Sequence, residues 1–365
     1  MSTGACLDGV AVLDLTWNLP GPYASFVLAS MGAVVTKVEP PRGDPARHMP
    51  GLFEALNREK RSLVLDLQTE DGRTRLHEEI RRADVLLEGF RPGVAERLGC
   101  GAAAATATNP RLVYCSISAW GQDGPMRDVP GHDLNAQALA GACHLGRDAA
   151  GRPHGLPLPI ADLSASMSAV SSICAALYAR ERDGKGRVLD IAMVDGVLSW
   201  SHVWSQVDLG GDAARQVPRG LGPLARRLLE KLDRERLHAL PHYELYRCRD
   251  GRWLALGIVD EKHFWKSLCG VLGLRGVEAL PMAGRALAAP LLKRWIGRRL
   301  RSRSRDAWLE ALGAAGVPAS PVLTPQEAVS EPHVAARLVG PSGTVRAPVA
   351  GARHLGGRAP GLEVP

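Results

Sequence analysis

The feature that most constrains the fold of this chain is a regular alternation of short apolar segments with helix-like segments over its N-terminal third. The apolar segments are rich in valine, isoleucine and leucine, which is typical of strands that are buried on both faces. We predict strands at residues 10–15, 33–38, 62–67, 85–88 and 112–117, and helices at 23–31, 72–83 and 94–98. This alternation predicts a doubly wound parallel sheet in an α/β domain.

The chain has 365 residues, which is too long for one typical domain and comfortable for two. Its C-terminal half differs from the first half. Residues 209–240 are basic and irregular, and we interpret them as a linker plus an exposed helix. Residues 243–247 and 253–258 then predict a β-hairpin that opens a smaller mixed domain. A second basic run, residues 293–305, has apolar residues at helical spacing, so a solvated helix face explains it better than nucleic-acid binding does.

The composition of the chain limits which binding partners and which cellular compartment we expect. The seven cysteines show no Cys-x-x-Cys spacing, so we expect reduced thiols and no structural zinc. The first residues lack a basic and apolar leader, and no apolar run approaches the roughly 20 residues that cross a bilayer. We therefore expect a cytoplasmic protein with no membrane partner. The net charge of +7 favours an anionic partner, but charge does not choose among nucleic acid, a membrane surface and a phosphorylated small molecule.

Two short segments carry the residue types that proton transfer needs, namely Gly131-His132-Asp133-Leu134-Asn135 and Ala161-Asp162. A histidine and a carboxylate on opposite faces of one carbon can remove a proton from one face and return one to the other. A long helix is predicted from Asp162 to about Arg182, with Asp162 at its N-cap. A carboxylate there is also a common structural cap, and one histidine among eleven is usually structural, so both interpretations stay open from these residues alone.

A set of motifs extends along most of the chain. It consists of Leu13-Asp14-Leu15-Thr16, Lys37-Val38-Glu39-Pro40, Lys60-Arg61-Ser62, Gly89-Phe90-Arg91-Pro92-Gly93, Asn109-Pro110-Arg111-Leu112, Gly184-Lys185-Gly186-Arg187, Ala315-Gly316-Val317-Pro318 and Glu331-Pro332-His333. In combination these motifs resemble those of the family III CoA-transferases, of CaiB/BaiF type, and of their relatives the α-methylacyl-CoA racemases. The resemblance covers the chain apart from about residues 200–240.

The resemblance implies an interlocked homodimer whose active site lies between subunits. It implies a large doubly wound, Rossmann-like domain built from residues 1–195 and 331–365, and a smaller α+β domain at 242–313. Residues 196–241 would form a linker and residues 314–330 a return linker. Each small domain would be threaded through its partner subunit.

The resemblance also implies that the anionic partner is coenzyme A, carried as part of an acyl-CoA substrate, with no prosthetic group and no nucleic acid. The residues that it places in contact with coenzyme A are Leu65, Asp66, Leu67, Gln68, Gly89, Phe90, Arg91, Arg97, Gly131, Asp133, Leu134, Asn135 and Ala136. Arg91 and Arg97 are the expected phosphate partners, because arginine binds phosphate oxygens with paired hydrogen bonds.

Two chemistries occur among the proteins that the chain resembles. In the transferases an aspartate at the position of Asp162 acts as a nucleophile and forms an aspartyl-CoA thioester. In the racemases the matching aspartate is one of two bases, and the histidine of the Gly-His-Asp stretch, here His132, is the other. Glu261 matches a racemase glutamate that pairs with this histidine from the partner subunit and raises its basicity. The transferases also have a glycine-rich loop before the hairpin, and residues 220–242 contain no such run.

The energetics explain why such a site needs more than two bases. The α-proton of a thioester has a pKa of roughly 20 and an imidazole one of about 6.5, which leaves roughly 18 kcal/mol to be supplied. Donors aimed at the thioester oxygen must stabilise the enolate that forms.

Four departures from the family pattern bear on the substrate, one of which is Pro241-His242-Tyr243 in place of the usual apolar segment. Pro40 occupies a position where relatives often have an arginine that binds coenzyme A, and Arg42 is a possible substitute. Leu158 replaces the asparagine that supports the racemase aspartate. Ser164-Ala165-Ser166 replaces a glycine run, so we expect a bulkier wall beside the acyl group.

The leading hypothesis is an acyl-CoA racemase or epimerase that acts on a 2-methyl-branched or other α-substituted acyl-CoA. The alternative is a CoA-transferase that uses Asp162 as its nucleophile. A third hypothesis, from the basic runs, is a dimer that binds acyl-CoA or nucleic acid without catalysis.

Overall fold

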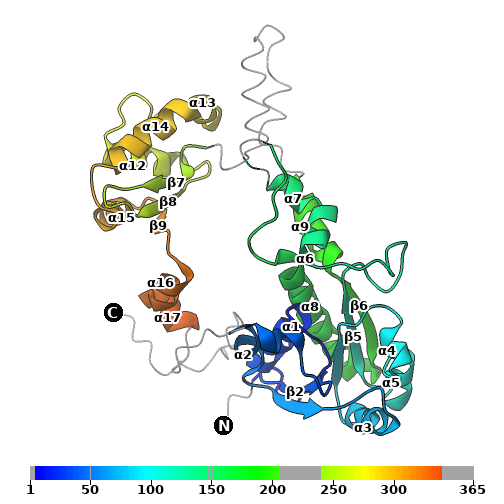
Figure 1. Ribbon diagram of the computed structural model, residues 1–365. Helices are drawn as coiled ribbons and strands as arrows, with labels where there is room; N and C mark the ends of the chain where they lie inside the picture. The colour runs from blue at the N-terminus through cyan, green and yellow to red at the C-terminus, as the bar shows by residue number, and fades with distance from the viewer. Residues whose placement is uncertain (1–4, 50, 147, 149–150, 206–239, 339–365) are drawn as a thin grey trace. The chain divides into compact units, whose positions relative to one another are not determined.

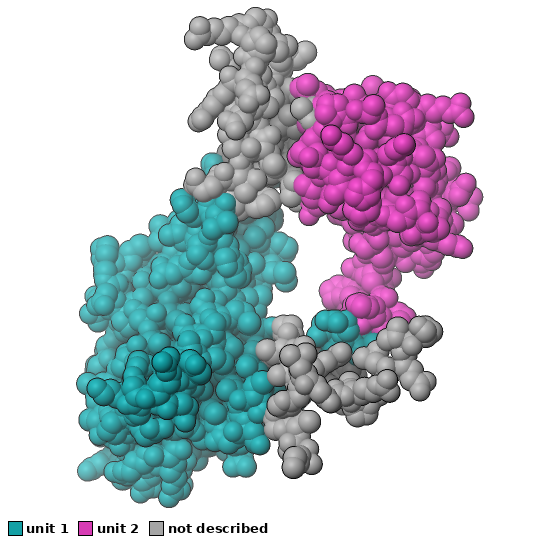
Figure 2. Space-filling model, turned by 180° about the vertical axis from the view of Figure 1, so that it is seen from behind, with its two compact units in different colours: residues 1–204, 335–365 teal, residues 205–334 magenta. Residues whose placement is uncertain are grey.

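The computed structural model describes residues 5–49, 51–146, 148, 151–205 and 240–338. It divides into two compact units, Met1–Trp204 with Ala335–Pro365 and Ser205–Val334 (Figure 2). Unit 1 and unit 2 each have their own hydrophobic core. The predicted linker and exposed helix at residues 209–240 lie almost entirely outside the described residues.

Unit 1 is built on a parallel sheet, and this confirms the predicted fold class. Its strands are β1 (Ala11–Asp14), β2 (Val34–Glu39), β3 (Arg61–Val64), β4 (Val85–Glu88), β5 (Val113–Ser118) and β6 (Arg187–Ala192) (Figure 1). They lie in the order β3-β2-β1-β4-β5-β6, and every neighbouring pair is parallel. The strand order therefore reverses between β1 and β4, and open sheets of this kind bind ligands outside the carboxyl ends of the strands at that point.

The helices of unit 1 cover both faces of this sheet. They are α1 (Pro20–Ser30), α2 (Leu52–Asn57), α3 (Glu70–Ile80), α4 (Val94–Arg97), α5 (Ala102–Thr108), α6 (Asp133–Leu139), α7 (Ala142–Leu145), α8 (Ile160–Asp183) and α9 (Met193–Ser205). Alternate strand residues face opposite layers. Val12 packs with the layer that contains α1 and α8, whereas Leu13 packs with the layer that contains α3 and α5.

Helix α8 corrects two expectations. It begins at Ile160, so Asp162 lies in its first turn and is not the N-cap residue, which is Pro159. By length and composition α8 is also apolar enough to cross a membrane, contrary to the expectation that no segment is. It is instead a core helix, whose buried side chains include Val170, Ile173 and Leu177 and which packs against α1, β5 and β6. It ends at Gly184, which has a left-handed backbone as the Asp183-Gly184 pair predicts.

Several elements were not predicted, among them strands β6 and β9 and helix α9. Strand β6 is the last strand in the order, and its first four residues are half-buried or exposed, so it lacks the continuous apolar run of its neighbours. Strand β9 (Ala319–Pro321) is short and carries a proline. Helix α9 includes residues 196–205, the first part of the predicted linker. It is held by buried Val197 and by Ser201, whose hydroxyl donates to the Ala140 carbonyl at 2.6 Å.

Unit 2 is a small α+β unit, and its predicted hairpin is confirmed. Strand β7 (Tyr243–Arg247) pairs antiparallel with β8 (Trp253–Gly257), which also pairs with β9. The helices are α12 (Lys262–Leu272), α13 (Met282–Leu287), α14 (Ala289–Leu300), α15 (Arg305–Ala314) and α16 (Pro325–Ser330), and α17 (Pro332–Leu338) begins in unit 2 and ends in unit 1. On α14, Leu292, Ile296 and Leu300 are buried while most of its basic side chains are exposed, as expected for a solvated helix face.

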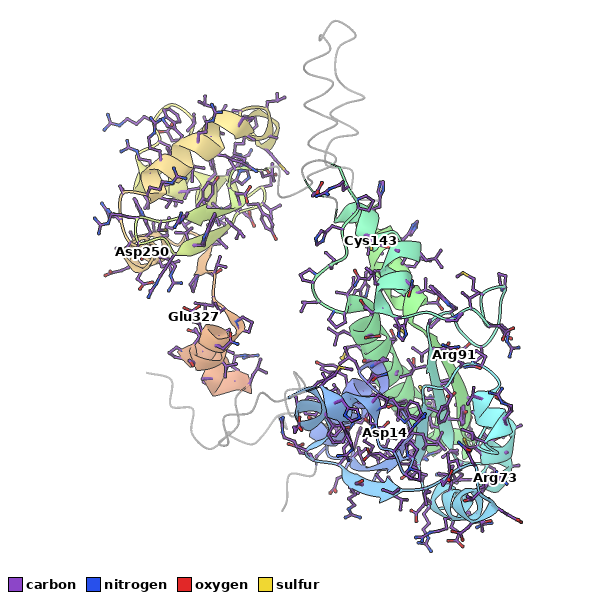
Figure 3. The ribbon with its side chains drawn as sticks, viewed as in Figure 1. Asp14, Arg73, Arg91, Cys143, Asp250 and Glu327 are labelled. Carbon is purple, nitrogen blue, oxygen red and sulfur yellow. The ribbon has the colours of Figure 1, made fainter. Side chains whose placement is uncertain are left out.

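A buried ionic network fixes the segment that follows β1 (Asp14 is labelled in Figure 3). Asp14 is fully buried and accepts hydrogen bonds from Lys60 Nζ at 3.0 Å and from Ser25 Oγ at 2.5 Å. Burial alone would raise the pKa of Asp14, but the ammonium groups of Lys60 and Lys37 hold it well below its usual range. Lys37 Nζ also donates to the Thr16 carbonyl at 2.8 Å. The network therefore anchors the loop that leaves β1 at the switch point.

Candidate active site

A cavity of about 860 Å³ opens at the carboxyl ends of the strands of unit 1. Its lining comes from the segments that follow β1, β2, β3, β4 and β5, together with parts of α1, α8 and α9. This is the position at which a doubly wound sheet binds its ligand, on both sides of the switch point between β1 and β4. All of the lining residues belong to unit 1.

Most of the predicted site residues line this cavity. These are Leu65, Asp66, Leu67, Gln68, Gly89, Phe90, Arg91, Gly131, His132 and Asp162. Arg97, Asp133, Leu134, Asn135 and Ala136 lie outside the lining, and their contact with coenzyme A stays a prediction. Glu261 belongs to unit 2, so its pairing with His132 also stays a prediction.

His132 is positioned by its immediate neighbours in sequence. It directly precedes α6, and its backbone N–H donates to Asn135 Oδ1 at 3.1 Å. A Cβ atom on Gly131 would lie 2.6 Å from a ring atom of Trp120, so only glycine allows this close approach. Trp120 Nε1 in turn donates to the Val129 carbonyl at 2.9 Å. The loop before α6 is therefore packed against Trp120, and the imidazole is left exposed at the cavity.

Asp133 connects the two predicted catalytic residues. Its Oδ1 accepts hydrogen bonds from the backbone N–H of Ala161 at 2.8 Å and of Asp162 at 3.3 Å. These N–H groups lie in the first turn of α8, where a helix has no carbonyl partners of its own. Asp133 therefore caps α8, which is the role that the sequence analysis predicted for Asp162. Gln137, which is buried, donates to Asp133 Oδ2 at 2.6 Å and holds this carboxylate in place.

The Asp162 carboxylate is left available for chemistry. No other described residue forms a hydrogen bond with its side chain, because the helix cap is supplied by Asp133. Burial and, to a smaller extent, the negative charge of Asp133 raise the pKa of Asp162 to about 7. A carboxyl group in this environment is present in both protonation states near neutral pH.

This raised pKa predicts a measurable effect on stability. In the unfolded chain the pKa of Asp162 returns to about 3.8, so ionisation costs folding free energy as the pH rises from about 4 to 7, and the full cost remains above pH 7. Asp162→Asn is therefore expected to increase the free energy of unfolding by about 2–4 kcal/mol at pH 8.5 but by only about 1 kcal/mol at pH 5. Chemical denaturation at the two pH values measures this difference. An equal effect at both pH values would contradict the assigned protonation.

The expected bulky wall at residues 164–166 is not part of the cavity. Ser164 and Ser166 are buried, and neither lines it. Ser164 Oγ donates to the Ala161 carbonyl at 2.9 Å, and Ser166 Oγ donates to the carbonyls of Pro20 at 2.6 Å and Asp162 at 2.7 Å. These hydroxyls therefore pack α8 within unit 1. Leu158 does not support Asp162 through its side chain, but its carbonyl accepts from Gln137 at 3.3 Å.

Three arginines line the cavity and can meet an anionic ligand. Arg42 lies over the ring of Trp17, with its guanidinium carbon 5.4 Å from the ring centroid. Arg91 follows β4 (labelled in Figure 3), and Arg127 lies in the loop before His132. Arg127 was not predicted, because it belongs to an irregular segment that no motif marks. Among the described residues, no cluster of three or more His, Cys, Asp or Glu side chains could hold a metal ion.

Comparison with known proteins gives the family. Residues 7–345 match the model of CoA-transferase family III. The chain is 33% identical to an acetyl-CoA:oxalate CoA-transferase of Acetobacter aceti, over 90% of this chain and 84% of that protein. It is also 33% identical to the human alpha-methylacyl-CoA racemase, over 90% of this chain and 80% of that protein.

The solved structures agree with this result. A CaiB/BaiF family protein from Brucella suis matches with a TM-score of 0.77 at 28% identity, covering 95% of this chain and 93% of that one. The matching relatives include both racemases and transferases, and the two named above have equal identity to this chain, so the comparisons do not choose between the two reactions. The chain belongs to CoA-transferase family III, a family of enzymes that use CoA thioesters as substrates.

Proposed function

We propose that the protein is an acyl-CoA racemase or epimerase that inverts the α-carbon of a 2-methyl-branched or other α-substituted acyl-CoA. The observation that carries this proposal is that His132 and Asp162 line one cavity at the switch point of the sheet. A nucleophilic transfer needs only the aspartate, whereas inversion needs a second group that can accept and donate a proton.

The protonation of Asp162 supports the same reaction. In one direction a neutral imidazole on His132 takes the α-proton and a protonated Asp162 delivers a proton to the opposite face. In the reverse direction the roles of the two groups are exchanged. A carboxyl pKa of about 7 makes both the protonated and the ionised form of Asp162 available near neutral pH, and a group that donates a proton in one direction and accepts one in the other needs both forms.

The enolate between these two steps requires stabilisation at the thioester oxygen. Asp162 lies at the N-terminal end of α8, and the positive end of this long helix favours a developing negative charge, although the N–H groups of Ala161 and Asp162 already donate to Asp133. The arginines of the cavity are suited to the phosphates of coenzyme A, since each can donate several hydrogen bonds to phosphate oxygens.

We expect Arg91→Ala to weaken binding of the thioester without changing the chemical step. Loss of a hydrogen bond to a charged group costs about 1.5–3 kcal/mol, so KM should rise about 10- to 100-fold while kcat changes by less than about twofold. Steady-state kinetics with one acyl-CoA measures both quantities. Arg75→Ala, an exposed arginine on α3 outside the cavity, is the matched control and should leave KM unchanged. A fall in kcat at unchanged KM would contradict the assigned role.

The proposal includes a second subunit. Glu261, carried by unit 2 of a partner chain in an interlocked homodimer, would pair with His132 and favour its protonated form. Sedimentation of the purified protein tests the dimer. A chain that is monomeric at assay concentration and fully active would rule out this part of the proposal.

One observation favours the second candidate, a CoA-transferase. Asp162 lines the cavity with an unpaired carboxylate among the described residues, as a nucleophile would. Its raised pKa reduces the fraction of Asp162 that is in the ionised, nucleophilic form near neutral pH but does not remove that form.

The test is equilibration of a single enantiomer without an acceptor acid. Purified enzyme is incubated with (2S)-2-methylacyl-CoA alone, and the acyl group is analysed by chiral chromatography after hydrolysis. We expect a mixture of both enantiomers. Retention of the starting enantiomer, with CoA transfer on addition of a free carboxylic acid, would support the transferase instead. Binding with neither reaction across a panel of acyl-CoA substrates would leave a binding protein as the explanation.

A further inference from the structure

Val259–Glu261 is an exposed three-residue loop of unit 2, and it forms hydrogen bonds with buried polar side chains. The loop lies between β8 and α12, and Glu261 directly precedes α12. Glu261 Oε2 accepts the backbone N–H of Val259 at 2.9 Å. Interactions of the carboxylate with its own backbone N–H, and next with that of Val259, lower the pKa of Glu261. The bond to Val259 fixes the direction of the carboxylate.

Arg285 of α13 anchors this loop from the interior. Its side chain is fully buried, and its guanidinium carbon lies 5.4 Å from the ring centroid of Trp265. Its NH2 donates to Asp260 Oδ1 at 3.2 Å and approaches the Asp260 carbonyl at 3.5 Å. A buried arginine whose ionic partner is an exposed carboxylate costs several kcal/mol of desolvation. An apolar residue of similar volume would stabilise the core at least as well.

His242 supplies the second anchor. It is fully buried against Trp265, with ring centroids 5.4 Å apart, and its Nε2 lies 2.8 Å from the Val259 carbonyl. The same nitrogen lies 3.0 Å from NH1 of Arg285, and this approach is a contact and not a second hydrogen bond when Nε2 donates to the Val259 carbonyl. Burial lowers the pKa of His242 to about 4, so this imidazole is uncharged at neutral pH and acts as a fixed hydrogen-bonding group.

We infer that Arg285 and His242 are positioning residues that fix the Val259–Glu261 loop so that Glu261 presents one carboxylate oxygen to His132 of a second copy of the chain. This inference rests on the proposed function. Arg285 and His242 hold the carbonyl of Val259 and both the carbonyl and carboxylate of Asp260, which are the two residues before Glu261. Both side chains are fully buried in unit 2, and their proposed effect is exerted through Glu261.

A double-mutant cycle tests this mechanism. Arg285→Gln, Glu261→Gln and the double variant are compared in the inversion assay. If Arg285 acts through Glu261, Arg285→Gln lowers kcat about 10-fold at unchanged KM in the wild type but less than about twofold when Glu261 is already replaced. The same factor in both backgrounds, or a parallel rise in KM, would overturn the inference.

Asp260→Ala serves as a second variant in case Arg285→Gln does not fold. The Asp260 side chain is 66% exposed, so its removal releases the anchor without opening a cavity. It should reproduce the loss of kcat and the dependence on Glu261. Arg305→Gln is the matched control, since Arg305 is also a buried arginine of unit 2 but bonds to Asp306 and the Val322 carbonyl. An equal kcat loss in the control would show a merely structural effect and overturn the inference.

Amide hydrogen exchange at Val259 separates this inference from the proposed function. Arg285→Gln should accelerate exchange of the Val259 N–H at least about 10-fold, because local opening becomes easier when the anchor is lost. If the wild type inverts no acyl-CoA, the proposed function fails and this measurement alone decides whether Arg285 fixes the loop. An unchanged exchange rate would then overturn that assignment.

Discussion

Replacement of His132 by alanine is expected to lower the rate of inversion of both enantiomers of a 2-methylacyl-CoA by a factor of about 10²–10⁴, the usual contribution of a positioned acid or base. Inversion needs both faces of the α-carbon, and the variant retains only Asp162. With the enantiomer whose α-hydrogen faces Asp162, however, exchange of that hydrogen with solvent should persist, because one base can remove and return it on the same face.

Chiral chromatography measures inversion, and proton NMR in deuterated water measures exchange for each enantiomer separately. His144→Ala is the matched control, because His144 is an exposed histidine of unit 1 that does not line the cavity. It should behave as the wild type. A His132→Ala variant that inverts at an unchanged rate would exclude His132 as one of the two bases.

Asp162→Asn is expected to give the mirror image of this result. The asparagine keeps the shape of the side chain but transfers no proton, so inversion should again fall by about 10²–10⁴. Exchange should now persist only with the enantiomer whose α-hydrogen faces His132. The two variants together would therefore show opposite one-sided exchange, a pattern that loss of folding or loss of CoA binding does not produce.

The same variant should be more stable than the wild type above pH 7, because it removes the cost of ionising Asp162 in its buried position. A gain in stability with a loss of activity is the expected signature of a group held for function. Asp195→Asn, an exposed carboxylate in the first turn of α9, is the control and should change neither property. Exchange with both enantiomers in Asp162→Asn would mean that another group acts as the second base.

Much of the fold could be predicted because the central strands are buried on both faces. The run Val85–Leu87 is apolar, Glu88 is buried with it, and the predicted limits 85–88 are those observed. Strand β6 was missed because its first four residues are half-buried or exposed, and β9 because it is short and pairs only in the tertiary structure. The start of α8 was misplaced for a related reason, since its cap is the distant Asp133 and leaves no local signal.

The site was predictable where chemistry depends on residue type and not where it depends on tertiary contact. His132 and Asp162 were found from their neighbours in sequence, and both line the cavity. Only the structure shows that the hydroxyls of Ser164 and Ser166 donate to backbone carbonyls. Only the structure shows that Arg127 lines the cavity.

The most direct test of the central claim is a single incubation of the wild-type enzyme with one enantiomer of 2-methylacyl-CoA, a free carboxylic acid and deuterated water. Proton NMR follows the α-hydrogen while chromatography follows any new CoA thioester, and hydroxylamine in a parallel sample reports an aspartyl-CoA intermediate as a hydroxamate on Asp162. The account predicts α-deuteration with inversion, no CoA transfer and no hydroxamate. Transfer of CoA to the free acid with hydroxamate on Asp162 and an undeuterated α-carbon would contradict it.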